Sequence, residues 1–96
     1  MASTPESKVK KRVVDQLKQL GAYYFYPVTG GYGASGVPDI VGCYKGKFFA
    51  IECKAGKNKP TPLQQKNLDA IAAQDGAALV VNEENMAGVT TWLTTL

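Results

Sequence analysis

Apolar residues at helical spacing open the chain and predict a first helix in residues 3–21. Ser3 or Thr4 can cap its N-terminus, and Pro5 suits the first turn. Ser3 together with Glu6 also fits the capping-box pattern. The apolar stripe of this helix consists of Val9, Val13, Leu17 and Leu20.

Two further helices are predicted in the second half of the chain. Residues 61–76 begin with a capping box made by Thr61 and Gln64. Residues 83–96 carry apolar side chains on one side of a final helix, namely Met86, Val89 and Leu93.

Four stretches rich in aromatic and β-branched residues predict strands, at residues 22–28, 39–44, 47–55 and 77–82. The last stretch is apolar throughout its first five residues, which is typical of a buried parallel strand. The element order αβββαβα therefore predicts an α/β fold in which helices flank a mixed four-stranded sheet. A length of 96 residues predicts a single domain, residues 1–96.

The hairpin between the second and third predicted strands brings two acidic side chains together. If Lys45-Gly46 forms a two-residue turn, the register places Asp39 directly opposite Glu52. Opposed residues of an antiparallel pair have Cβ atoms about 4.5–5.5 Å apart on one face of the sheet. Lys54, two residues beyond Glu52, projects from the same face.

Opposed carboxylates destabilise a sheet unless the strand ends are open to water or a cation lies between the oxygens. A site of hard oxygen ligands suits Mg²⁺ or Mn²⁺, and the backbone carbonyl of Cys53 is a candidate third ligand beside Asp39 and Glu52. Pro38 suits the first residue of a strand and marks where pairing begins. The glycine-rich residues 29–36 before it let the backbone pass close to a polyanion, although they match no phosphate-binding motif.

The residue types present limit which catalytic groups the protein can use. The sequence contains no histidine, which excludes Ser-His-Asp and Cys-His catalysis. Cys43 and Cys53 are predicted on opposite faces of the sheet as small buried residues, with neither a disulfide nor a cysteine-based metal site. Carboxylates, lysine and a hard metal ion remain as catalytic groups.

The net charge of +3 is unevenly distributed. Basic residues crowd the first helix, including Lys8, and the stretch after the third strand, including Lys57 and Lys59. Such basic surfaces favour nucleic acid, although a solvated helix face and loop would look the same. Lys8, Lys57 and Lys59 are candidate phosphate contacts, and Tyr32 is either a stacking residue for a base or sugar or an exposed loop aromatic.

The chain shows no signal peptide and no apolar run of about 20 residues, so no membrane association is expected. The expected location is intracellular.

"GVPDI" followed by "IECKAG" resembles the two half-motifs of the PD-(D/E)XK nuclease superfamily. Together, "SGVPDIVG", "IECKAG" and "PTPLQQKNL" resemble a small stand-alone, phage-like member of its VRR-NUC branch (virus-type replication-repair nucleases), which implies the cytoplasm of a bacterial or phage-infected cell. The resemblance implies a restriction-endonuclease-like core and Mg²⁺- or Mn²⁺-dependent hydrolysis of phosphodiesters. It implies that Asp39 and Glu52 ligate the metal and that Lys54 orients or activates water and stabilises developing charge.

Two more catalytic positions follow from the resemblance. Glu6 is similar to the acidic residue on the first helix of this branch, and its register places it at the N-terminal end of the apolar stripe, facing inward. Gln64 is similar to the glutamine that follows "PL". Each has a simpler interpretation, Glu6 as a capping acid and Gln64 as the capping partner of Thr61, and Gln65 is a neighbouring alternative.

The resemblance implies a homodimeric, structure-selective DNA endonuclease that acts on branched DNA such as four-way (Holliday) junctions. Residues 23–26 and Trp92 are candidate interface residues, although a tryptophan at Trp92 is more often part of a core. The alternatives are a non-catalytic nucleic-acid-binding module with the same fold, a flap or nicking nuclease, and a structural domain with exposed edge acids.

Overall fold

The computed structural model describes residues 4–28 and 36–96, and its elements follow the predicted order. They are α1 (Pro5–Leu20), β1 (Tyr23–Phe25), β2 (Ile40–Tyr44), β3 (Lys47–Cys53), α2 (Pro62–Ala73), β4 (Ala77–Val81), a 3₁₀ turn η1 (Met86–Gly88) and α3 (Val89–Thr94). The predicted αβββαβα order is confirmed.

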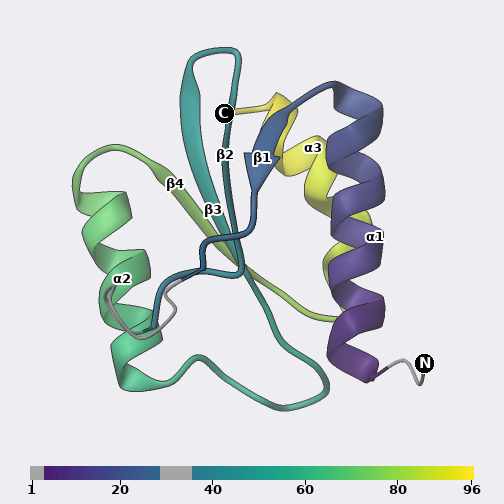
Figure 1. Ribbon diagram of the computed structural model, residues 1–96, viewed down its shortest axis with the longest axis vertical. Helices are drawn as coiled ribbons and strands as arrows, with labels where there is room; N and C mark the ends of the chain where they lie inside the picture. The colour runs from purple at the N-terminus through teal and green to yellow at the C-terminus, as the bar shows by residue number, and fades with distance from the viewer. Residues whose placement is uncertain (1–3, 29–35) are drawn as a thin grey trace.

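The four strands form one sheet in the order β1-β2-β3-β4. The first three pair antiparallel, and β4 pairs parallel to β3, so the sheet is mixed as predicted. In Figure 1, α1 and α3 cover one face of the sheet and α2 lies on the other. The N-terminal ends of α1 and α2 and the C-terminal ends of β3 and β4 gather at the lower end of this view.

Helix α1 begins one residue later than its capping box requires. Thr4 is the N-cap, because its hydroxyl oxygen accepts the Ser7 N–H at 3.1 Å. Glu6 is therefore the second helical residue rather than the third, and the expected box of Ser3 with Glu6 is wrong. The helix ends at Gly21, whose φ of 71° supplies the left-handed C-terminal residue.

The predicted hairpin is confirmed down to its register. Lys45 and Gly46 both have positive φ, as a two-residue type I′ turn requires, and Tyr44 pairs with Lys47. Pairing continues outward as far as Ile40 with Ile51 and then stops.

One hydrophobic core lies between the sheet and α1 with α3. Cys53 is fully buried in this core, whereas Cys43 on the opposite face is exposed, so the predicted burial of Cys43 is wrong. Both thiols are free. Trp92 is partly buried and packs against the core. The fully buried side chains of highest volume include Phe49, Leu17, Ile40, Ile51 and Val81.

The C-terminal segment departs most from prediction. Residues 83–85 form a turn rather than the start of a helix, because asparagine side chains bind the local backbone. Asn82 N–H donates to Asn85 Oδ1 at 2.8 Å, and Glu84 N–H donates to Asn82 Oδ1 at 2.9 Å. The regular helix α3 begins only at Val89.

A buried glutamine joins α1 to this segment. Gln16 Nε2 donates to the carbonyl of Met86 at 2.7 Å and to that of Arg12 at 3.1 Å. Its Oε1 accepts the Thr90 N–H at 3.0 Å and the Thr90 hydroxyl at 3.1 Å. Gln16 is 9% exposed, so these bonds fix the docking of α3 in a mostly apolar interface.

Within the described ranges 4–28 and 36–96, none of the helices combines the length and apolar character that crossing a membrane requires.

Replacing Gln16 with alanine should lower the free energy of unfolding by about 2–3 kcal/mol, because Met86 O and Thr90 N–H lose their partner in a buried setting. Urea unfolding followed by circular dichroism measures this change. Gln19→Ala, an exposed substitution on the same helix, is the matched control and should change stability by less than about 0.5 kcal/mol. Equal stability of the two variants would contradict the prediction.

Candidate active site

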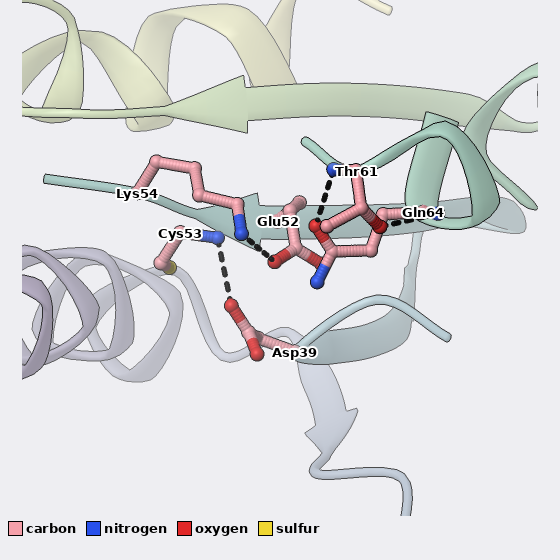
Figure 2. A network of polar contacts seen from close by, with 6 residues as sticks. All are labelled: Asp39, Glu52, Cys53, Lys54, Thr61 and Gln64. Atoms are coloured by element: carbon pink, nitrogen blue, oxygen red, sulfur yellow. Dashed lines mark hydrogen bonds and ion pairs between the residues drawn. The ribbon is translucent and has the colours of Figure 1, made fainter. Parts of the chain in front are cut away.

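The candidate site lies where the ladder between β2 and β3 ends. In a continued register Pro38 would stand opposite Cys53 as a hydrogen-bonded pair. Proline has no N–H to donate to the Cys53 carbonyl. The Cys53 N–H instead donates to Asp39 Oδ2 at 2.9 Å (Figure 2). Asp39 thus lies in a bend just before β2, and the predicted ladder pair of Asp39 with Glu52 does not form.

Glu52 is nevertheless next to Asp39, and it is buried. Its side chain is on the sheet face that carries α2 and is 2% exposed as a residue. The ammonium of Lys54 lies 3.5 Å from Glu52 Oε2, which confirms that these two side chains share a face. No described residue hydrogen-bonds to the buried Glu52 Oε1. A buried carboxylate oxygen without a donor is costly, and such an atom points to a missing ligand.

The N-terminus of α2 completes this side of the site. Thr61 and Gln64 form the predicted capping box, in which Gln64 Oε1 accepts the Thr61 N–H at 2.9 Å. The amide nitrogen of Gln64 then points toward Glu52 (Figure 2). Gln65 is directed elsewhere, since its amide nitrogen donates to Asp69 Oδ1 at 2.9 Å.

Gly36 sets the distance between Asp39 and α2. Its φ is +76°, and a Cβ at this position would lie 2.9 Å from the carbonyl carbon of Leu63 and 3.0 Å from the Gln64 nitrogen. Only glycine allows the segment before Asp39 to pack this closely against the start of α2.

Burial raises the pKa of Glu52 to about 7, and the negative charge of Asp39 adds to this rise. The ammonium of Lys54 opposes it. The site therefore holds one carboxyl group whose ionisation needs additional positive charge.

The pKa of Cys53, whose side chain lies on the other face of β3, is shifted as well. Burial raises the pKa of the Cys53 thiol to about 12, with smaller contributions from Asp39, Glu52 and Glu6, while Lys10 opposes the rise. Glu6 lies in the first turn of α1. Its side chain is exposed, however, so the expectation that it faces inward is wrong.

The donor set fits a hard divalent cation. Within residues 4–28 and 36–96, no three His, Cys, Asp or Glu side chains form a metal-binding group. Two carboxylates are present, and the Cys53 carbonyl points to the same strand edge as its N–H, toward Asp39. An ion such as Mg²⁺ that keeps several waters needs no more than this from the protein.

Comparison with known proteins agrees with this geometry. No family model matches the chain. A relative from Acyrthosiphon pisum secondary endosymbiont phage 1, named "Putative nuclease p44", is 28% identical over 85 residues, covering 88% of this chain and 89% of the relative. A solved VRR-NUC domain superposes with a TM-score of 0.74 at 19% identity, covering 93% of this chain and 97% of its own. The chain has the VRR-NUC fold. A second solved structure, a VRR-NUC domain protein, superposes with a TM-score of 0.68 at 19% identity, covering 99% of this chain and 89% of its own.

The resemblance indicated by "GVPDI", "IECKAG" and "PTPLQQKNL" is thereby confirmed. In this VRR-NUC fold the three stretches meet: the first carries Asp39, the second Glu52 and Lys54, and the third Gln64.

The other predicted residues lie farther out. Lys57 and Lys59 are exposed on the loop between β3 and α2, and Lys8 is exposed on α1. Tyr32 lies outside the described residues. The structure thus gathers Asp39, Glu52, Lys54 and Gln64, and leaves the three lysines on the surrounding surface.

Sequence reasoning missed one residue that shapes this surface. Glu83 Oε1 accepts the Gly56 N–H at 2.9 Å and so ties the loop that carries Lys57 and Lys59 to the end of β4. Hydrogen bonds from the backbone N–H groups of Gly56 and of Glu83 itself lower the pKa of this carboxyl. The 27 residues between the partners leave no local signal for this contact.

The raised pKa of Glu52 predicts a pH dependence of stability in metal-free protein. Between about pH 4.5 and 7 the folded chain keeps a proton that the unfolded chain has lost, so the free energy of unfolding falls as pH rises through this window. Glu52→Gln should abolish this fall and gain up to about 3 kcal/mol relative to wild type between pH 4.5 and 8.

Thermal and urea unfolding in EDTA, at pH values from 4.5 to 8, measure this difference. Glu84→Gln, which changes an exposed carboxylate, should follow the wild-type curve. Parallel stability curves for wild type and Glu52→Gln would show that Glu52 ionises normally.

Proposed function

We propose that this protein is a Mg²⁺- or Mn²⁺-dependent DNA endonuclease that hydrolyses phosphodiester bonds in branched DNA such as four-way junctions. The observation that supports it most is the buried Glu52, with one unpartnered oxygen, between Asp39 and Lys54. The name of the phage relative and the VRR-NUC fold support the same class of activity.

Asp39, Glu52 and the Cys53 carbonyl would hold the metal ion. When bound, the ion supplies Lewis-acid stabilisation of negative charge on a phosphoryl oxygen. Lys54, already next to Glu52, places a positive charge where charge develops in the transition state and can orient water by hydrogen bonding. The amide nitrogen of Gln64, whose oxygen is held by the capping box, points toward Glu52 and is a donor for a bound phosphate or water. Glu6 is the remaining candidate catalytic residue, at the N-terminal end of α1.

Exposed lysines around this site are suited to hold DNA. Lys57 and Lys59 lie on the loop that leaves β3, and Lys8 lies on the first turns of α1. Tyr32 stays a candidate stacking residue. Contacts from lysines to backbone phosphates carry no sequence information, which agrees with cleavage directed by DNA structure rather than by sequence.

The two acidic residues of the site, Asp39 and Glu52, argue against a non-catalytic DNA-binding module of the same fold. Two neighbouring carboxylates repel phosphate and give a binding module no advantage. Burying one of them at the strand end costs stability, which is expected where the site performs a reaction. A flap or nicking nuclease would use the same site, and the choice of substrates in the assay separates it from a junction nuclease.

Asp39→Asn and Lys54→Ala should each reduce DNA cleavage by at least about 100-fold, because each removes a group that acts on the transition state. Linear duplex, 5′-flap and four-way-junction DNA are incubated with Mg²⁺, with Mn²⁺ or with EDTA, and products are resolved on denaturing gels. Wild type should cut the junction fastest and cut nothing in EDTA.

Asp75→Asn is the matched control, since it makes the same chemical change at an exposed position after α2 and should cleave as wild type. Metal-independent cleavage, or full activity of Asp39→Asn, would refute the mechanism. Preferential cutting of flaps would retain the mechanism and correct the substrate.

The proposal includes a homodimer, which presents two sites related by a two-fold axis to a junction of similar symmetry. Aromatic side chains are exposed on the half of the sheet face that lies beside α2: Tyr23 is 68%, Phe25 47% and Phe48 45% exposed. Strand β1 is also an edge strand. Exposed aromatic residues along an edge strand favour a protein interface.

Light scattering should therefore give a mass of twice the 10.3 kDa chain, and Phe25→Ser should shift the protein toward monomer. Val28→Ser, at an 89% exposed position beyond the strand, is the control that keeps the dimer. A monomer at all concentrations tested would exclude this part of the proposal.

A further inference from the structure

A groove of about 380 Å³ runs along the side of α1 that faces the end of β1. Its lining includes three lysines, a serine, an aspartate and a tyrosine: Lys10, Lys11, Lys18, Ser7, Asp15 and Tyr26. Their helical spacing places the α1 residues on one face of the helix, over a rise of about 16 Å from Ser7 to Lys18. None of them belongs to the candidate active site.

The charge of this groove is positive and is only partly neutralised. Lys11 forms an exposed ion pair with Asp15 at 2.9 Å. Lys10 and Lys18 form no ion pair with any residue in 4–28 or 36–96. The groove therefore offers two ammonium groups that need a counter-charge, on residues whose Cα atoms are about 12 Å apart along the helix axis.

Tyr26 gives the groove an aromatic wall. Its ring lies 4.3 Å from the ammonium of Lys10, measured to the ring centroid, and is 45% exposed. This cation–π contact holds Lys10 over the groove, and the phenol hydroxyl remains a possible donor to phosphate. Lysines beside an exposed aromatic ring are typical of surfaces that follow a nucleic-acid backbone.

The groove begins at the end of the fold that holds the candidate active site. The N-terminal half of α1, which carries Ser7 and Lys10, lies at the same end of the sheet as the C-terminal end of β3, where the Cys53 N–H binds Asp39 (Figure 1). A strand entering the site at Asp39 can thus pass Lys10 first and Lys18 two turns later.

We propose that the α1–Tyr26 groove binds the phosphate backbone of a DNA arm that leads away from the candidate active site. This inference rests on the proposed function and adds the surface that holds the substrate. Lys10 and Lys18 neutralise phosphates, and Tyr26 orients Lys10 and forms the wall.

The test compares Lys10→Gln and Lys18→Gln with Arg12→Gln. Arg12 is exposed on the same helix but outside this groove, so its substitution removes the same charge and serves as the control. Fluorescence anisotropy in EDTA measures binding of four-way-junction DNA from 50 to 300 mM salt. Each groove variant should bind roughly fivefold more weakly near 0.15 M salt and lower the slope of log K against log salt by about 0.9.

Cleavage kinetics give an independent readout. Lys18 lies two turns beyond Lys10 along α1. Lys18→Gln should raise the KM for junction DNA while leaving kcat within twofold. A defect in folding would instead lower the fraction of active enzyme and therefore kcat. Circular dichroism melting checks folding, and Lys18→Gln keeps the test valid if Lys10→Gln does not fold.

The outcomes separate the two proposals. If wild type neither binds nor cleaves DNA, the proposed function fails. If wild type binds and cleaves, while Lys10→Gln and Lys18→Gln match Arg12→Gln in affinity and salt slope, the groove assignment alone is overturned.

Discussion

The end of the β2–β3 ladder is the constraint on which the candidate site depends. A hairpin that kept pairing past Ile40 and Ile51 would use the Cys53 N–H and carbonyl in the sheet. Pro38 prevents this because it has no N–H, and the Asp39 side chain takes over the Cys53 N–H. A carboxylate is thereby fixed beside a carbonyl that the ladder does not use, which is the arrangement of oxygen atoms that a hard cation needs.

This arrangement conflicts with stability in the absence of a ligand. Glu52 is on the covered face of a central strand, where an apolar residue would pack without cost, and Lys54 compensates only one of its oxygens. The strain is local, since the turn at Lys45-Gly46, the core on the other face and the cap of α2 are all satisfied. Within residues 4–28 and 36–96, Glu52 Oε1 is the one buried side-chain polar atom without a hydrogen-bond partner, and such an isolated exception is typical of a functional site.

The sequence predicted the features that depend on residues close together in the chain. The turn at Lys45-Gly46 fixes the hairpin register, and the alternation of side chains along β3 puts Glu52 and Lys54 on one face. Asp39 joins them from a bend just outside the ladder. The sequence did not predict contacts between segments that lie far apart in the chain. Nothing local marks Gln16 as a buried link to α3, or Glu83 as the tie to the loop at Gly56.

The two predicted interpretations of Gln64, capping residue or site residue, are compatible because they use different atoms. Only the amide oxygen can accept the Thr61 N–H, so the capping bond fixes which way the amide is turned. The donor end must then face away from the cap, and the close approach of Gly36 to Leu63 and Gln64 holds the segment before Asp39 against the start of α2. The cap therefore orients the donor toward Glu52, and local helix chemistry contributes directly to the geometry of the site.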